Sequence, residues 1–355
     1  MLSRTADHLF WMARYTERAE NTARMLDVRV QYSLMPQSAQ AEQQGWRTML
    51  GVSELQSQFD AKYASLTQKE VLDFMVRDPD NPSSIASCLR AARENARAVR
   101  GTLTTEVWEI VNTTWLALQQ HLKSRTFEHN PGQFLEWVKY RSHMSRGVTL
   151  GTMFQDEAFN FIRLGTFLER ADNTARILDV KFRFFGSGTF QDEAQGEFYY
   201  LGALLRSVSA FETYRKVYRD AITPNRVAEL LILDPKMPRS LVACLCGVVS
   251  NLQEVRNDLS HETERLAEEL YARLQSAQIE DILSEGLHQF LTRFLASIAE
   301  LGNGIGRDFL LPVAPELPEE STDTAPVETA PAVSQAQTQT QSQTQTQTQT
   351  QVQAG

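Results

Sequence analysis

A twelve-residue segment occurs twice in this chain, and this repetition constrains the fold more than any other feature. Residues 17–28 read ERAENTARMLDV, and residues 169–180 read ERADNTARILDV, 152 positions later. The two differences, Glu20 against Asp172 and Met25 against Ile177, keep the charge and the apolar character of their positions. The same physical constraint therefore acts on both copies.

The duplication extends over most of the chain. Residues 71–89, VLDFMVRDPDNPSSIASCL, align with residues 227–245, VAELLILDPKMPRSLVACL, at an offset of 156. Each half is then roughly 155 residues long, which is enough for one hydrophobic core. We expect a first helical repeat over residues 1–155 and a second over residues 156–311, packed together as one compact unit.

The periodicity predicts helices nearly everywhere before the tail. Apolar residues recur at spacings of three and four over residues 82–100, 105–123, 160–182 and 286–301, with abundant Ala, Leu, Glu and Arg. Alternation typical of strands is almost absent. The expected fold class is all-α, with two tandem helical-bundle repeats related by a pseudo-twofold axis.

Composition limits the function classes. The net charge of −9 disfavours binding to a nucleic-acid backbone, and no apolar run is long enough to span a membrane. The N-terminus lacks the pattern of a secretory signal, which favours the cytoplasm. Residues 312–355 are rich in Pro, Thr and Gln and end in a QTQTQT tract, so we expect a disordered tail. Cys88, Cys244 and Cys246 are expected to be reduced core residues.

On a helical wheel, the first repeated segment has two specified faces. Ala19, Ala23 and Leu26 share one face, whereas Glu17 and Arg24 lie on the opposite one. Polar residues recur in both copies, so the polar stripe is also constrained. One interpretation is structural: the helix is central, and its Glu and Arg side chains form buried ion pairs across the pseudo-twofold axis.

The alternative interpretation is functional. Glu17 and Glu169 would flank a polar cavity, with either carboxylate acting as a general base, while nearby guanidinium and amide groups hold an amino acid or a peptide. The ligand-binding candidates in the two motifs are Arg18, Asn21, Arg24, Arg170, Asn173 and Arg176. Further candidates are Arg93, Glu94, Asp156 and Glu157, which are equally consistent with solvated helix faces.

A metal site is not expected. A di-metal carboxylate bundle needs two Glu-x-x-His pairs, and Glu285 with His288 is the only pair at this spacing. The sequence also has no GxSxG elbow, no phosphate-loop lysine signature and no Cys-x-x-Cys pair. No cofactor is expected.

The segments HLFWMARYTERAENTARMLDV, FIRLGTFLERADNTARILDV, CLRAARENARAVR and GTMFQDEAFNFIRLG resemble the bacterial Alpha-E family, over residues 1–311. The resemblance implies an all-α fold. It also implies gene neighbours that encode an ATP-grasp ligase and a transglutaminase-like peptidase, and hence a part in making or processing a peptide or amide-linked product.

Three hypotheses for function follow. The first is an accessory or substrate-carrying partner of an ATP-grasp amide ligase that binds an amino acid or peptide in a Glu/Arg-lined cavity. The second is an enzyme that uses Glu17 or Glu169 as a general base. The third is a structural scaffold in which the repeated motif is a buried ion network.

Overall fold

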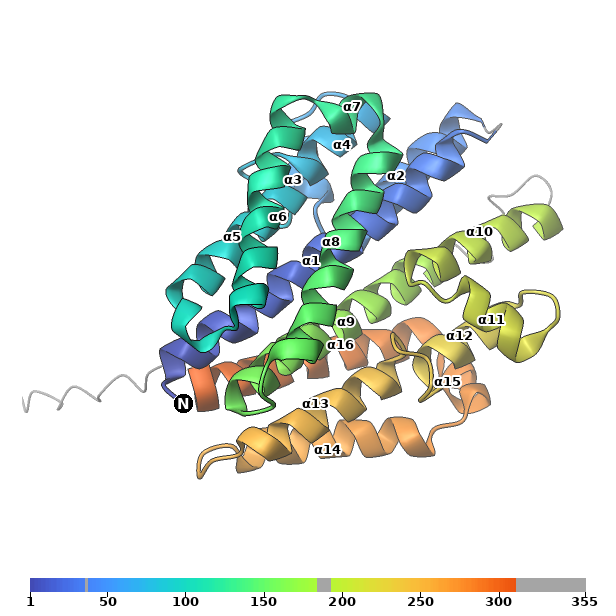
Figure 1. Cartoon of the computed structure of the whole chain (residues 1–355). Coiled ribbons are helices and arrows are strands. Elements are labelled where there is room, and N and C mark those ends of the chain that lie inside the picture. Colours follow the sequence, from blue (N-terminus) through green and yellow to red (C-terminus); the bar gives the residue numbers. More distant parts are fainter. Residues whose placement is uncertain (36–37, 184–192, 311–355) are drawn as a thin grey trace, which may run out of the picture. The chain divides into compact units, whose positions relative to one another are not determined.

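The repeated segments form the central parts of two long helices that lie side by side. In a computed structural model, which describes residues 1–35, 38–183 and 193–310, α1 spans Ser3–Ser33 and α9 spans Glu157–Arg183. The two helices make the most extensive helix–helix contact in the described chain and run through the middle of Figure 1. Each motif therefore faces the other helix.

Further helices cover this central pair. Helices α5, Ile85–Ala98, and α8, Pro131–Thr152, pack on α1, whereas α13, Leu241–Val255, and α16, Leu287–Ile305, pack on α9 (Figure 1). Helix α6, Thr105–Lys123, closes the first group by packing on α5 and α8. Helix α14, His261–Ser276, closes the second by packing on α13 and α16.

Shorter helices complete the described chain, and the prediction of an all-α fold is confirmed. No strand occurs in the described segments, which all lie in one compact unit. The remaining elements are α2 Ala39–Val52, α3 Gln56–Asp60, α4 Gln68–Val76, η1 Arg100–Thr102, α7 Thr126–His129, α10 Glu193–Ser207, α11 Phe211–Tyr218, α12 Pro224–Ile232, α15 Ile279–Glu285 and η2 Gly306–Leu310.

Hydroxyl groups mark the starts of the covering helices. The Ser84 side chain accepts a hydrogen bond from the backbone N–H of Ser87 at the start of α5, and Ser240 accepts one from Ala243 at the start of α13. Each serine satisfies an amide that the helix itself leaves unpaired. Serine caps are therefore present at corresponding places of the two duplicated blocks.

Close approach of α1 and α9 depends on a glycine. A side-chain carbon at Gly165 would overlap the backbone carbonyl oxygen of Phe10 and would also press on Ala13. The neighbouring atoms are mostly backbone, which cannot turn aside as a flexible side chain can. Gly165 therefore sets the spacing at which the two motifs meet.

Two sequence expectations need separate comment. Cys88 and Cys244 are buried, but Cys246 is exposed, so its assignment to the core was wrong. Cys246 lies two positions after Cys244 on α13, and a helical turn places such neighbours on different faces. The predicted tail, residues 312–355, lies outside the described residues. Within those described, no helix combines the length and the apolar character that a bilayer span requires.

Candidate functional site

The repeated Glu–Arg dipeptides lie at the contact between α1 and α9, away from solvent. The side chains of Glu17 and Glu169 are 1% and 6% exposed, and the neighbouring Glu20 is fully buried. Thr22, Ala23 and Leu26 on the other face of α1 are buried too. The helix is therefore enclosed on both specified faces, which explains why neither face varies freely between the copies.

Each glutamate is paired with the arginine of the other motif. The Arg170 guanidinium donates from Nε and Nη2 to the two carboxylate oxygens of Glu17, at 3.0 Å each. Arg18 donates in the same way to Glu169, at 2.6 and 3.0 Å. These two-pronged pairs have the geometry in which guanidinium binds carboxylate most strongly. The structural interpretation of the motif requires such buried pairs between the two helices.

Arginines outside the motif add to the Glu17 side of this cluster. Arg146 of α8 donates to Glu17 at 3.0 Å and also contacts Glu20. Arg239, which precedes α13, lies 2.9 Å from Glu17 and 2.8 Å from Glu20, and it donates to the side-chain oxygen of Asn21. Sequence reasoning missed both arginines. The sequence contained one sign of Arg239: in the alignment of the two blocks, Arg239 stands where the first block has Ser83.

The Glu169 side has a smaller set of partners. Arg14 of α1 donates to Glu169 at 2.8 Å. The position that corresponds to Arg14 in the second repeat is Thr166, which donates to the carbonyl of Ile162 and belongs to no ion pair. The two motifs therefore have unequal surroundings.

Electrostatics keep these carboxylates ionised. Burial alone would raise the pKa of Glu17, but the charges of Arg170, Arg239 and Arg146 outweigh it and hold the pKa well below its ordinary value. Burial opposes ionisation of Glu169 in the same way, and Arg14 and Arg18 lower its pKa. Carboxylates with such low pKa values are weak proton acceptors near neutral pH. The geometry thus favours an ion network over a general base at either residue.

Among the other candidates in the first motif, Arg24 and Asn21 belong to the same cluster. Arg24 donates from Nε and Nη2 to Glu20 at 2.8 and 2.7 Å. It also contacts the hydroxyl of Ser209, between α10 and α11, and His143 of α8. The amide nitrogens of Asn21 and of its counterpart Asn173 are both buried without a partner, and Arg176 of the second motif pairs with Glu54.

The four candidates outside the motifs are not brought to the cluster. Arg93 donates to Asn112 and to Glu94, and Glu94 also pairs with Arg97 on the outer side of α5. Asp156 accepts hydrogen bonds from the backbone N–H groups of Ala158 and Phe159 at the start of α9. Glu157 pairs with the N-terminal ammonium group. Each residue has a local partner that accounts for it.

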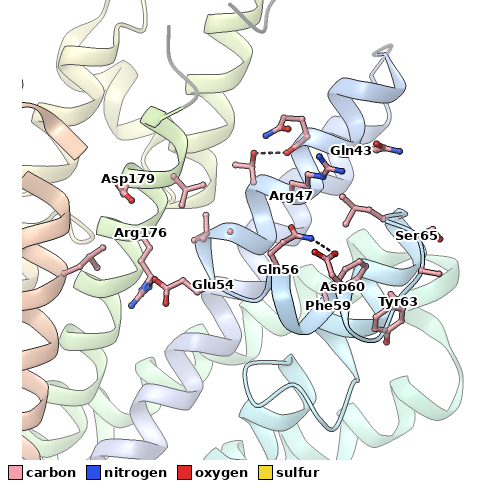
Figure 2. A pocket seen from close by; sticks show the side chains of 18 residues that line it. Gln43, Arg47, Glu54, Gln56, Phe59, Asp60, Tyr63, Ser65, Arg176 and Asp179 are labelled. Atoms are coloured by element: carbon pink, nitrogen blue, oxygen red, sulfur yellow. Dashed lines mark hydrogen bonds and ion pairs between the residues drawn. The ribbon is translucent and has the colours of Figure 1, made fainter. Parts of the chain in front are cut away.

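A cleft lies beside Arg176, between α9 and the α2–α3 region, as Figure 2 shows. Its volume is about 930 Å³. Arg176 donates to Asp172 at 2.8 Å and pairs with Glu54 at 2.6 Å. Arg176 and Glu54 both line the cleft. Arg47 and Asp60 line the cleft opposite (Figure 2). Of the sequence candidates, only Arg176 lines this cleft.

Sequence reasoning missed the rest of the cleft. Its walls come largely from residues 43–66, which lie between the two blocks aligned in the first repeat. Polar residues there show no spacing that distinguishes a binding wall from a solvated surface. The described residues contain no group of three or more His, Cys, Asp or Glu side chains placed to hold a metal ion.

Comparisons with known proteins assign a family. Uncharacterized protein Mb2597 of Mycobacterium bovis and Uncharacterized protein Rv2567 of Mycobacterium tuberculosis are each 25% identical to this chain over 325 residues. The match covers 83% of this chain and 35% of each relative, so the chain spans about a third of their length. No solved structure is significantly similar. A family described as a predicted alpha-helical domain with a conserved ER motif matches residues 1–310, and the chain therefore belongs to the Alpha-E family.

Proposed function

We propose that this protein is a non-catalytic binding module that holds an amino acid or short peptide for a peptide or amide ligase. The observation that carries the proposal is the 930 Å³ cleft beside Arg176. Pockets that bind small molecules commonly have volumes of roughly 300–1,000 Å³. The cleft is therefore large enough for a ligand of several residues.

The charges that line the cleft suit a zwitterionic ligand. Arg47 and Arg176 can bind a terminal carboxylate, and Asp60 and Glu54 can receive an ammonium group; the pair between Arg176 and Glu54 is open to solvent on the Glu54 side, unlike the buried pairs of the motif. Arg47 makes no ion pair within the described chain and is exposed, so its guanidinium is available. Phe59 and Tyr63 stack at a centroid distance of 4.9 Å and give the same wall an apolar part.

The Glu–Arg motif then has a structural role in this proposal. It fixes α1 against α9, and α9 carries Arg176 to the cleft. An enzyme that uses Glu17 or Glu169 as a general base is less favoured, because both carboxylates are occupied by guanidinium groups and have lowered pKa values. The cleft, in contrast, has its polar groups at the surface.

The proposed partners are an ATP-grasp ligase and a transglutaminase-like peptidase. They follow from the family resemblance described for the sequence. The curated relatives add a consistent fact, since the segment that matches this chain forms about a third of each longer polypeptide. A module that occurs within longer chains is suited to act beside other domains. The carried ligand would be the substrate or the product of the ligase.

We also propose that the two halves, residues 1–155 and 156–311, arose by duplication and are related by a pseudo-twofold axis. Corresponding helices pack alike: α5 and α8 on α1, and α13 and α16 on α9. The serine caps and the exchange of ion pairs between the motifs correspond as well. The cleft is an exception to this correspondence, because its walls come largely from residues 43–66 of the first half.

Isothermal titration with dipeptides tests the binding proposal. We expect a free dipeptide to bind the wild-type protein, and binding to weaken at least tenfold when its amino group is acetylated or when Arg176 is replaced in Arg176→Gln. Arg90→Gln is the matched control, because Arg90 is exposed on α5 and does not line the cleft. Dipeptide affinity that is equal in Arg176→Gln and Arg90→Gln would contradict the proposal.

A further inference from the structure

The ion cluster at the α1–α9 contact has buried carboxylates and several partly exposed guanidinium groups, and it contains more positive than negative charge. Its carboxylates are Glu17, Glu20 and Glu169. Its guanidinium groups, among the residues that the structure describes, are Arg14, Arg18, Arg24, Arg146, Arg163, Arg170 and Arg239. Charges that are partly removed from water are costly unless opposite charges compensate them. The surplus of guanidinium groups therefore calls for additional negative charge.

Arg163 is the member of this cluster without a carboxylate. Its guanidinium lies 4.4 Å from the ring centre of Phe167, and no described carboxylate is within ion-pairing distance. The groups that act on it electrostatically are the guanidiniums of Arg170 and Arg146, which repel it. Arg163 is thus held at a place where its neighbours disfavour a positive charge.

A small cavity lies beside Arg163. It has a volume of about 30 Å³ and is lined by the charged residues Arg163, Arg146 and Glu17, by the hydroxyl-bearing residues Thr16, Ser145, Thr149 and Thr166, and by the apolar residues Met12, Ala13, Leu150 and Ile162. This is enough room for a water-sized group. The Thr16 and Thr149 hydroxyls donate to carbonyls of their own helices, so the free N–H donors at the cavity come chiefly from the arginines.

The contacts of His143 show the same excess of donors around Arg146. Arg146 Nη2 lies 2.7 Å from Nδ1 of His143, and Arg24 Nη2 lies 3.0 Å from Nε2. A neutral imidazole accepts at one ring nitrogen only, and its other nitrogen carries a proton. One of these guanidiniums therefore faces an N–H group rather than an acceptor.

We infer that the cavity between α1, α8 and α9 binds a small anion between the guanidinium groups of Arg146 and Arg163. The volume fits a halide ion or one oxygen of a carboxylate or phosphate group. A water molecule would fill the space but would leave the charge surplus uncompensated. The site is separate from the cleft beside Arg176 and does not depend on the function proposed for that cleft.

Thermal unfolding at low ionic strength tests this site, with sodium chloride, acetate, phosphate and gluconate as probes. We expect at least one of these anions to raise the Tm of the wild type by roughly 3–6 °C with a saturating dependence, at concentrations about 100-fold above its Kd. Arg163→Gln should lose this response. Without added anion, Arg163→Gln should melt at or above the wild-type Tm, because it removes an uncompensated charge.

Arg90→Gln is the matched control and should keep the full wild-type response. The bulky gluconate distinguishes the source of the bound group: a response to chloride alone indicates a free ion, whereas a response to gluconate indicates the end group of a larger ligand. Equal responses in wild type, Arg90→Gln and Arg163→Gln would overturn the inference. So would a wild type that responds to none of the four anions.

A second measurement does not depend on how the variants fold. Crystals of the wild-type protein soaked in bromide should show an anomalous scattering peak between Arg146 and Arg163. Bromide peaks elsewhere on the protein, with none at this cavity, would contradict the site.

Discussion

The guanidinium of Arg170 donates to both carboxylate oxygens of Glu17, at 3.0 Å each, and Arg18 does the same for Glu169. Each motif therefore supplies one carboxylate and one guanidinium group to the two ion pairs that join α1 and α9. A change in either residue of one motif removes a direct partner from the other motif. This reciprocity gives a physical reason for the two residues to occur together, twice.

Loss of either buried carboxylate should destabilise the fold. Removing one partner of a buried ion pair costs about 3–5 kcal/mol. We expect Glu17→Gln to cost more than Glu169→Gln, because Glu17 contacts Arg146, Arg170 and Arg239, whereas Glu169 contacts Arg14 and Arg18. Urea unfolding at pH 7 measures the difference.

Glu94→Gln is the control for these substitutions, since Glu94 pairs only on the outer side of α5. Its cost should stay within about 0.5 kcal/mol. If Glu17→Gln were as stable as Glu94→Gln, the motif would not be the structural network described.

Acid should weaken the protein through the same residues. The pKa values of Glu17, Glu20 and Glu169 are lower in the folded chain than the ordinary 4.5, so the unfolded chain binds protons more readily. Their contribution is therefore complete above about pH 5 and is lost as the pH falls below it. Each group contributes a slope of up to about 1.4 kcal/mol per pH unit. Between pH 5 and 3, the free energy of unfolding should fall less steeply with pH in Glu169→Gln than in the wild type. Identical slopes in the two proteins would argue against this assignment.

The glycine at the helix crossing gives a test that involves no charge. Gly165→Ala should cost about 1–3 kcal/mol, because the added carbon overlaps the Phe10 carbonyl and forces α1 and α9 apart. Gly147→Ala is the matched control on α8, where the added carbon meets no atom within 4 Å. There, the better helix propensity of alanine should stabilise by about 0.5–1 kcal/mol. Thermal unfolding of both variants checks the opposite signs, and a stabilising Gly165→Ala would be evidence against the close crossing.

The three cysteines should differ in reactivity. Burial raises the pKa values of Cys88 and Cys244 to about 12, and neither thiol is accessible. Cys246 is exposed and free. A thiol reagent should therefore modify Cys246 alone in the native protein and all three thiols in denaturant. Rapid modification of Cys246→Ser under native conditions would show that the core at Cys88 or Cys244 opens readily.

Much of the fold follows from local sequence patterns. Thr105–Lys123 is the helix that apolar periodicity predicts, and α9 extends the predicted residues 160–182 by a few positions at its ends. The serine caps were readable because Ser84 and Ser240 stand at matching places just before apolar periodic runs. These features depend on residues close together in the chain, which is why the sequence predicts them.

The site depended on contacts between distant residues. The motif indicated that Glu17 and Glu169 need arginine partners, but Arg146 and Arg239 lie outside it and reach Glu17 only through tertiary packing. Arg176 was grouped with the other motif arginines. It lies two helical turns beyond Glu169, however, and forms an ion pair with Glu54. The cleft walls have no repeated counterpart, so no internal comparison could reveal them.

A double-mutant cycle between Glu17→Gln and Arg170→Gln tests the central claim most directly. Unfolding free energies of the wild type, both single variants and the double variant isolate the energy that couples the two side chains across α1 and α9. The reciprocal ion pair predicts a coupling of about 1–3 kcal/mol, with the double variant less destabilised than the sum of the single variants. A coupling below about 0.5 kcal/mol would mean that the two residues act independently, and the motif would not be the link between the helices.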